Sequence, residues 1–168
     1  NKILKGISNC IIIPHKNPDA DALGSSMALF SFLTKLGKKT KVILPNSPPG
    51  NLEWMINKGD VISYEKSPEK TKRYLSNSQI IFALDFNSLK RIGKLSKEIE
   101  SIKTPLIMID HHESPEKFST LFLSNPKIGS TCEIIYNIMK SINSELIDKE
   151  IATYIYSGIL TDTGSFRY

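Results

Sequence analysis

The chain contains only three histidines, and each stands beside aspartates directly after an apolar run. His15 opens the segment HKNPDAD, which also holds Asp19 and Asp21. The segment DHH, residues 110–112, follows the apolar residues LIMI. Because imidazole and carboxylate groups together bind divalent cations, these two segments predict a metal site without thiolate ligands.

Two further aspartates belong to the same pattern. Asp85 follows the apolar run IIFAL, and Asp162 lies in the turn-like segment TDTGS. Each acid taken singly has a structural explanation, since Asp19 and Asp21 precede a predicted helix that they could cap, and the other two fit turns. A structural role does not explain why all three histidines and these aspartates share strand ends, so the pattern favours a metal site.

The number and type of ligands indicate which cations would bind. Mixed nitrogen and oxygen ligands suit Mn²⁺ and, to a lesser degree, Mg²⁺, Fe²⁺, Co²⁺ or Zn²⁺. So many carboxylates would over-neutralise one divalent ion, so we expect two, about 3.5 to 4 Å apart. In an extended backbone, neighbouring side chains point to opposite sides. We therefore expect one of His111 and His112 to bind metal and the other to face the substrate.

The bulk composition is that of one globular domain. A chain of 168 residues, 40% apolar and 23% charged, can bury a core without disulfides. No apolar stretch approaches the roughly 20 residues of a membrane helix, so we expect no membrane partner, and without a leader pattern we expect a cytoplasmic protein. Cys10 and Cys132 form no CxxC pair and are predicted to be buried small hydrophobic residues.

The charge of the chain gives a weak indication of its partners. The net charge is +5, but the lysines are scattered through helix-like segments such as KLGKKTK and KLSKEIESIK. This distribution gives slight support to a phosphate-bearing substrate and predicts no binding of long duplex DNA. The sequence leaves a homodimer open.

Short β-branched runs alternate with amphipathic segments of helical length. The predicted strands are residues 10–15, 41–44, 61–64, 80–85 and 106–110. The predicted helices are residues 20–36, 67–75, 89–100, 130–142 and 148–160. This alternation predicts an α/β fold, a doubly wound and mainly parallel sheet with helices on both faces. Ligands of such sheets bind outside the carboxyl ends of the strands, where the acids and histidines are predicted to lie.

Four motifs in order, HKNPDAD, the strand-ending Asp85, DHH and TDTG, resemble those of the DHH phosphoesterase superfamily. The resemblance covers nearly all of residues 1–168 and implies that they form a DHH domain. Proteins of this kind continue into a DHHA1 domain with a Gly-rich, GGGH-like substrate site, which lies outside these residues.

The resemblance also implies a role for each motif residue. By this likeness the first cation would be held by His15, Asp19 and Asp85. The second would be held by Asp21, Asp85, His111 and Asp162, with Asp85 shared. The implied catalytic residues are Asp85, Asp110 and His112. His112 would contact the phosphoryl group or the leaving oxygen, and Asp110 would orient a histidine. His112 and Arg167 would bind substrate.

The implied reaction is in-line hydrolysis of a phosphate ester by a hydroxide held between two cations. HKNPDADALGS and DTGSFRY look most like the short-oligonucleotide branch, which includes nano-RNases that dephosphorylate 3′-phosphoadenosine 5′-phosphate (pAp) and hydrolases of cyclic dinucleotides or pApA. The expected partner is a short oligonucleotide or small nucleotide. The alternatives are a DHH-type inorganic pyrophosphatase, a RecJ-like exonuclease and a catalytically silent nucleotide-binding module, although no GxGxxG or Walker loop is present.

Overall fold

Six strands form one parallel sheet in the computed structural model, which describes residues 4–56 and 59–167. The strands are β1 Asn9–Pro14, β2 Lys39–Leu44, β3 Val61–Ser63, β4 Ile80–Leu84, β5 Leu106–Asp110 and β6 Leu121–Ser124. Their order is β3-β2-β1-β4-β5-β6, and all five pairings are parallel. The predicted doubly wound α/β fold is therefore confirmed.

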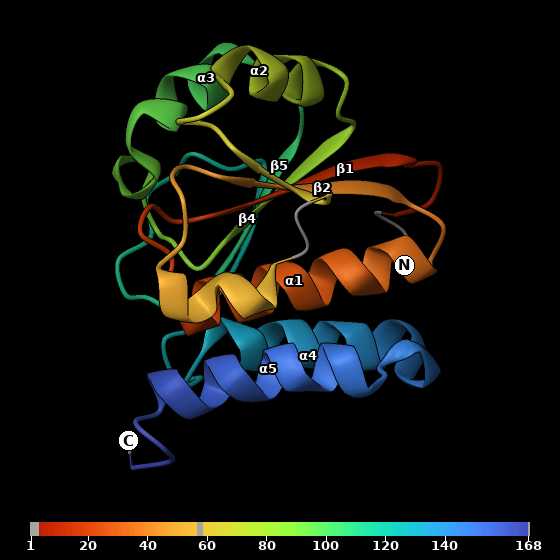
Figure 1. Cartoon of the computed structure of the whole chain (residues 1–168), viewed down its shortest axis with the longest axis vertical. Helices are drawn as coiled ribbons and strands as arrows, with labels where there is room; N and C mark the ends of the chain where they lie inside the picture. The colour runs from red at the N-terminus through yellow and green to blue at the C-terminus, as the bar shows by residue number, and fades with distance from the viewer. Residues whose placement is uncertain (1–3, 57–58, 168) are drawn as a thin grey trace.

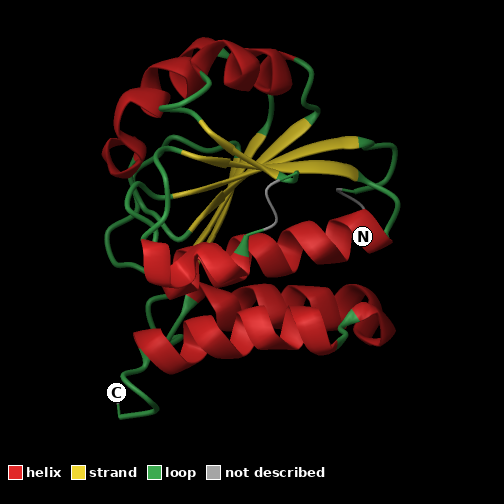
Figure 2. Ribbon diagram, viewed as in Figure 1, coloured by secondary structure: helices red, strands yellow, loops and turns green. Residues whose placement is uncertain are grey.

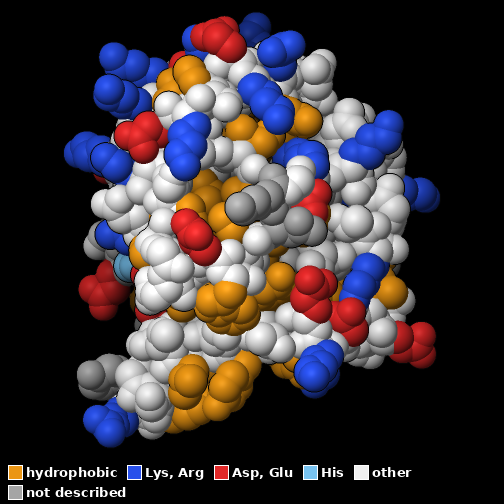
Figure 3. Space-filling view, in the orientation of Figure 1, with side chains coloured by type: hydrophobic (Ala, Val, Ile, Leu, Met, Phe, Trp, Pro, Cys, Tyr) orange, Lys and Arg blue, Asp and Glu red, His pale blue; other side chains and the backbone are white. Residues whose placement is uncertain are grey.

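Helices cover both faces of this sheet (Figures 1 and 2). The α-helices are α1 Ala20–Lys35, α2 Pro68–Ser76, α3 Ser96–Ser101, α4 Thr131–Asn143 and α5 Lys149–Asp162. Short 3₁₀ helices are η1 Gly50–Met55, η2 Leu89–Leu95 and η3 Ser144–Leu146. α1, α4 and α5 lie on one side, and α2 and α3 lie on the other, where Lys and Arg side chains crowd the surface (Figure 3). None of the helices in the described ranges is long and apolar enough to cross a membrane.

The strands are apolar on both faces because each face packs against helices. In β1, Ile12 belongs to the core shared with α1, α4 and α5, whereas Ile11 and Ile13 belong to the core under α2 and α3. All three are buried, as successive side chains of a strand in the middle of a covered parallel sheet should be. Cys10 and Cys132 are buried too, as predicted.

Two glycines allow α1, α4 and α5 to pack unusually closely. A Cβ atom on Gly24 of α1 would lie 2.5 Å from the backbone oxygen of Tyr154 in α5. A Cβ atom on Gly158 of α5 would lie 2.3 Å from the Sγ atom of Cys132 in α4. Only residues without a side chain fit at these contacts, so the sequence itself sets the spacing of the three helices.

Three local predictions need correction. The edge strand β6 was not predicted, because its residues are exposed on both faces and show neither an alternating nor a buried pattern. The predicted helix 89–100 is two elements, η2 and α3, since Gly93 interrupts it at φ +58°. Asp162 does not lie in a turn but is the last residue of α5, and the chain leaves the helix at Gly164, whose φ is +56°.

Candidate metal centre

The acids and histidines gather at the carboxyl ends of the adjacent strands β1, β4 and β5. His15 follows β1, Asp85 follows β4, and Asp110 ends β5. From β1 the sheet runs in one direction through β2 and β3 and in the other through β4, β5 and β6. The cluster therefore lies at the topological switch point, where open α/β sheets bind their ligands.

Asp85 occupies the middle of the cluster. Its side chain is 2% exposed, and its carboxylate lies 3.4 Å from Nε2 of His15 and 3.6 Å from Nε2 of His111. Its φ of +63° is uncommon for a residue other than glycine. The backbone N–H of Asp85 donates to the carbonyl of Ile109 in β5, which helps to fix this turn. The strained conformation directs the carboxylate between the two histidines.

His15 presents one ring nitrogen to two carboxylates. Its Nδ1 lies 2.8 Å from the carbonyl oxygen of Lys16, a contact in which Nδ1–H donates and the lone pair is left on Nε2. Nε2 is buried without a hydrogen-bond partner in the described part of the chain, although the carboxylates of Asp19 and Asp85 approach to 3.5 and 3.4 Å. A buried imidazole lone pair between two carboxylates suits a divalent cation.

Asp19 has a structural contact as well as a place in the cluster. It is the N-cap of α1, where its Oδ1 accepts the N–H groups of Asp21 and Ala22 at 3.0 and 2.9 Å. Its Oδ2 faces His15. Partial burial raises the pKa of Asp19, but His15 and the N–H donors outweigh it and lower that pKa to about 2. Capping therefore leaves the second oxygen of this side chain available for a cation.

A second group of ligand atoms includes His111 and Asp162. Nε2 of His111 lies 3.2 Å from Oδ2 of Asp162, and Nδ1 of His111 lies 3.3 Å from the carbonyl oxygen of Ile128. Asp21 completes this group, and its ligand atoms lie within 4.8 Å of one another, as do those of His15, Asp19 and Asp85. The structure therefore places two neighbouring sets of three candidate ligands together, and Asp85, a member of the first set, also forms a third such group with His111 and His112.

Residues at the N-terminus of α4 donate hydrogen bonds to the buried carboxylates of Asp21 and Asp85. The carboxylate of Asp21, which is 1% exposed, accepts the backbone N–H groups of Thr131 at 2.6 Å and Cys132 at 2.9 Å. The hydroxyl of Thr131 donates to Oδ1 of Asp85 at 2.9 Å. The sequence analysis did not identify Thr131. The available signal was the segment GSTCE at the start of a predicted helix, where N–H groups have no partner in the helix.

His112 is positioned mainly by Asp110. Asp110 is fully buried, and its carboxylate lies 2.7 Å from Nδ1 of His112 and accepts the backbone N–H of the same residue at 3.2 Å. This hydrogen bond raises the pKa of His112. The positive charge of Arg91 opposes that rise. With Nδ1 engaged, Nε2 of His112 is the nitrogen left for a substrate.

The two adjacent histidines do not point to opposite sides, as the sequence analysis had expected. Their ring centroids are 4.7 Å apart, at an interplanar angle of 56°. The reason is that β5 ends at Asp110, so the alternation of an extended strand does not reach residues 111 and 112. The two rings differ in their hydrogen-bond partners instead.

The charges of the cluster suit a positive ion. Burial and the neighbouring Asp85 carboxylate raise the pKa of Asp21 to about 8, and burial also raises the pKa of Asp162. Burial lowers the pKa of His15, but the carboxylates of Asp19 and Asp85 outweigh this effect and raise it to about 10. Carboxylates crowded in this way ionise fully only beside a cation, so the residues fit divalent metal ions.

Arg167, which was predicted to bind substrate, does not contact the acids and histidines of the cluster. Its side chain is exposed and forms no ion pair or hydrogen bond within residues 4–56 and 59–167, although its backbone N–H donates to the carbonyl of Thr163 at 2.8 Å. The structure does not join its guanidinium to the cluster.

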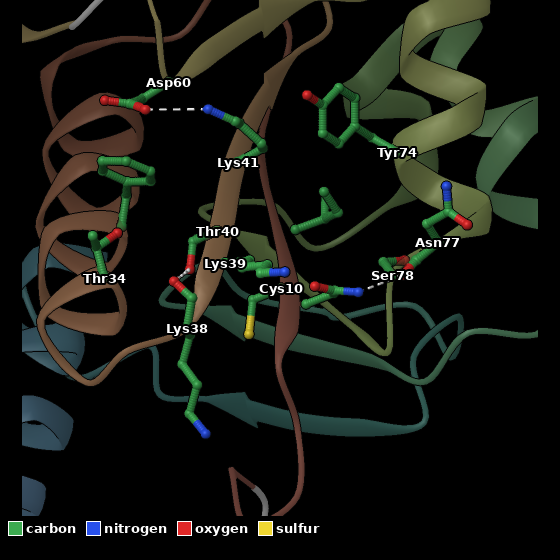
Figure 4. A pocket seen from close by; sticks show the side chains of 13 residues that line it. Cys10, Thr34, Lys38, Lys39, Thr40, Lys41, Asp60, Tyr74, Asn77 and Ser78 are labelled. Carbon is green, nitrogen blue, oxygen red and sulfur yellow. Dashed lines mark hydrogen bonds and ion pairs between the residues drawn. The ribbon is translucent and has the colours of Figure 1, made fainter.

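A cavity of about 510 Å³ lies at the other end of the sheet, where β1 and β2 begin (Figure 4). Two of its lysines already have partners in the chain. Nζ of Lys38 donates to the carbonyls of Leu4 and Ile7, and Nζ of Lys41 pairs with Asp60 at 3.2 Å. The ammonium groups of these two lysines are therefore already engaged.

A doubly wound parallel sheet with carboxylates and imidazoles at its switch point defines a class of metal-binding α/β domains. Within this class, residues 9–159 match the DHH family, N-terminal domain, and the chain belongs to that family. The resemblance seen in the sequence is confirmed.

Two curated relatives show what the family contains. The chain is 31% identical over 168 residues to the bifunctional oligoribonuclease and PAP phosphatase NrnA of Thermus thermophilus, covering 99% of this chain and 47% of that protein. It is 26% identical over 159 residues to a probable manganese-dependent inorganic pyrophosphatase of Streptococcus mutans, covering 94% and 49%. The chain thus spans about half the length of these relatives.

Solved structures agree with this assignment. An exopolyphosphatase-related protein from Bacteroides fragilis superimposes with a TM-score of 0.95 at 38% identity, covering 99% of this chain and 49% of that one. Exonuclease RecJ bound to manganese has a TM-score of 0.56 at 18% identity, covering 99% and 42%, and shows a shared fold alone.

Proposed function

We propose that the chain is the cation-binding domain of a phosphoesterase that hydrolyses phosphate esters of short oligonucleotides or small nucleotides. The observation that carries this proposal is the position of Asp85 between the two ligand groups. One shared carboxylate is the simplest way to hold two divalent cations, which we expect to be Mn²⁺, about 3.5 to 4 Å apart. Mg²⁺ and Co²⁺ are the alternatives, since the same oxygen and nitrogen ligands accept them.

Bound cations would supply an activated hydroxide and neutralise charge on the phosphoryl oxygens. The chain's own residues would do the rest. Nδ1 of His15 and of His111 each donate to a backbone carbonyl, which orients Nε2 toward the carboxylates. His112, protonated more readily because of Asp110, holds a proton at Nε2 and can donate it to the leaving oxygen.

The substrate class is supported by two observations. The NrnA relative acts, by its name, as an oligoribonuclease and PAP phosphatase, and its likeness extends over 99% of this chain. The segment GSFR after Asp162 resembles the nucleotide branch of the superfamily. An inorganic pyrophosphatase is the second candidate, favoured by the Streptococcus mutans relative at 26% identity. A catalytically silent module is disfavoured because every predicted ligand side chain is present.

One substrate panel tests the proposal. The full-length protein would be assayed with Mn²⁺ against short RNA, pAp, cyclic dinucleotides, pyrophosphate and a nitrophenyl phosphodiester. We expect Mn²⁺-dependent hydrolysis of the short RNA or a small nucleotide, with weaker activity on pyrophosphate. Faster hydrolysis of pyrophosphate would select the second candidate. Mn²⁺ binding without hydrolysis of any substrate would support a silent module.

A further inference from the structure

Basic side chains gather over α2, η2 and α3, on the surface that we call the basic face (Figure 3). Residues 65–76 and 89–103, which form these elements and their ends, contain nine lysines and arginines but four glutamates. This layer therefore carries a charge of +5, equal to the net charge of the whole chain. Residues 130–162, which form α4 and α5 on the other side of the sheet, contain two lysines and five acids.

The basic side chains of this face are exposed, and most have no acidic partner. Within residues 4–56 and 59–167, only the ammonium group of Lys72 has ion-pair partners on this face, Glu69 at 2.9 Å and Glu98 at 3.9 Å. The side chains of the other eight are exposed and form no ion pair or hydrogen bond in the same ranges: Lys66, Lys70, Arg73, Lys90, Arg91, Lys94, Lys97 and Lys103.

Packing of the helices joins these scattered positions into one surface. The buried residues of α2 face the sheet, which leaves Lys70 and Arg73 on the outer side of the helix. The contact of Lys72 in α2 with Glu98 in α3 holds the two helices side by side (Figure 1). Lysines that are far apart in the sequence therefore lie on one face of the folded chain.

Lysines near α1 and β2 have partners, unlike those of the basic face. Nζ of Lys35 lies 2.6 Å from Asp148, Nζ of Lys41 lies 3.2 Å from Asp60, and Nζ of Lys38 donates to two backbone carbonyls. Like charges that have no partners repel one another and destabilise the compact chain. An anionic partner on the basic face would relieve this repulsion.

The basic face lacks the apolar groups that a membrane or a protein partner would need. The large apolar side chains exposed in the described residues are Trp54, Tyr156, Phe166 and three of β6, and none of them belongs to α2, η2 or α3. Stable membrane attachment combines basic residues with an apolar anchor, and protein interfaces have an apolar core. Interfaces with nucleic acid are polar and strongly positive, which matches this face.

We propose that the basic face binds single-stranded nucleic acid through its phosphates, without reading its sequence. Each lysine or arginine that neutralises a phosphate releases a counterion, so the affinity grows with the number of phosphates reached. A flexible single strand can follow two short helices of nine and six residues. A duplex, with a persistence length of about 150 base pairs, would lie straight across them and contact fewer of the basic side chains.

The basic face borders the metal centre without including its candidate ligands. The carbonyl of Arg91 in η2 accepts the backbone N–H of Lys16 at 2.7 Å, and Lys16 follows His15 in the chain. A cleft of about 290 Å³ that includes Lys16 and Lys94 continues from there toward the start of α2. A strand bound to the basic face would therefore pass beside the cluster. Its binding requires neither cations nor hydrolysis, so it is independent of the proposed function.

Fluorescence anisotropy with a labelled single-stranded RNA of about 20 nucleotides, in EDTA, tests the proposal. We expect the combined variant Lys70→Gln, Arg73→Gln and Lys97→Gln to bind about 10-fold more weakly or worse. The slope of log K against log salt should fall in magnitude by about 2, because each phosphate contact of a single strand contributes ~0.7.

The matched control removes the same charge from exposed positions outside the basic face. The combined variant Lys127→Gln, Lys140→Gln and Lys149→Gln should retain the affinity and the salt slope of the wild type. Equal losses in the two variants would show that net charge alone attracts the RNA and would overturn the proposal. So would wild-type affinity in the variant of the basic face.

The length and the kind of polyanion provide a second comparison on the wild-type chain. RNA of about three nucleotides should bind at least ~10-fold more weakly than the longer strand, because it offers fewer phosphates. Tighter binding of a duplex of the same length would overturn the choice of a single strand. Vesicles of phosphatidylserine and phosphatidylcholine should bind weakly, and binding to them in preference to RNA would overturn the choice of partner.

Lysine acetylation in the wild-type chain locates the contact without any variant. Bound RNA should slow the acetylation of Lys70, Lys94 and Lys97, read by mass spectrometry, and leave that of Lys127 and Lys149 unchanged. Equal protection of both groups, or protection of the second group alone, would overturn the proposal. Neither experiment measures hydrolysis, so a chain that binds RNA on this face but cleaves no substrate would contradict the proposed function alone.

Discussion

Asp85 is the residue on which the cluster depends most. Asp85→Asn keeps the shape of the side chain but removes the charge that faces both His15 and His111. We expect the affinity for Mn²⁺, measured by isothermal titration calorimetry, to fall by well over ~100-fold. Loss of a residue that only hydrogen-bonds to a metal ligand typically costs ~10- to 100-fold. Asp60→Asn, which alters an acid paired with Lys41 away from the cluster, is the control and should bind Mn²⁺ normally. Unchanged affinity in Asp85→Asn would contradict the proposed centre.

A variant of Thr131 tests whether its hydrogen bond to Asp85 contributes to cation binding. Thr131→Val removes the hydroxyl that donates to Asp85 but retains the backbone N–H that donates to Asp21. We expect Mn²⁺ affinity to fall by about 10- to 100-fold, because an unsupported carboxylate is free to turn away. Thr131→Ser should restore most of the affinity. If the valine variant binds Mn²⁺ as tightly as the wild type, the hydroxyl has no part in the centre.

His111 and His112 should respond differently to truncation. His111→Ala removes a predicted ligand and should weaken Mn²⁺ binding, whereas His112→Ala should retain the ions and lower kcat by about 10² or more. The reason is that Nε2 of His111 faces Asp162, while His112 is bound to Asp110. Metal titration and steady-state kinetics on the same two variants check this. Equal loss of metal in both would contradict the division of roles.

For single residues, the sequence predicted the types of the candidate ligands better than the orientations of their side chains. His15, Asp85 and His111 could be named because each follows an apolar run, which places it at a strand end. The side-by-side rings of residues 111 and 112 could not be predicted, since they depend on where β5 stops. The contribution of Thr131 depends on the packing of α4 behind the sheet, which no local pattern encodes.

Close packing of the helices is what brings Asp162 to the other ligands. A Cβ atom on Gly158 would lie 2.3 Å from Sγ of Cys132 and 2.8 Å from Oδ1 of Asp21. We expect Gly158→Ala to push α5 away from α4, reduce the free energy of unfolding by about 1 to 3 kcal/mol and weaken Mn²⁺ binding. Urea unfolding and calorimetry measure the two effects. Ser157→Ala, one position earlier in α5, should change neither, and a fully stable Gly158→Ala with normal affinity would show that the helices can adjust.

Strands covered on both faces, such as those in the middle of the sheet, were predictable, whereas the exposed edge strand and the interrupted helix were not. β4 and β5 appear in the sequence as continuous apolar runs, because helices cover both of their faces. β6 is four residues long and exposed on both faces, so it gives neither an alternating nor a buried pattern. Gly93 adopts a positive φ inside an otherwise helical pattern, and glycine in a helix does not by itself predict a break.

For the whole molecule, the position of the site follows from the order of the strands. Alternation of strands and helices along the chain predicts a parallel sheet, and a parallel sheet places all its strand ends on one edge. The sequence could therefore bring together residues as far apart as His15 and His111 without any knowledge of their contacts. It could not predict the substrate, because substrate choice depends on surfaces that are specific to each protein and not to the fold.

Catalysis in the longer protein should be divided between the cation-binding chain and a second domain that binds the nucleotide. Catalysis by bound cations requires the remote groups of a substrate to align its phosphate, and binding energy from those groups provides the alignment. The chain spans 47% of its NrnA relative, and we propose that a DHHA1 domain in the longer protein grips the nucleotide. The 168-residue chain should therefore hydrolyse a nitrophenyl phosphodiester slowly with Mn²⁺ and gain little when given short RNA or pAp.

Comparison of kcat/KM for both protein lengths on the same three substrates provides the measurement. The longer protein should prefer the nucleotides clearly, while the two lengths should differ less on the nitrophenyl ester, because that ester offers few remote groups to bind. Asp85→Asn in each length controls for contaminating activity. If the 168-residue chain discriminates among nucleotides as sharply as the longer protein, the groups that recognise the substrate lie within it. Arg91 would then be the first residue to examine, because its positive charge acts on the pKa of His112, the residue that we place at the leaving oxygen.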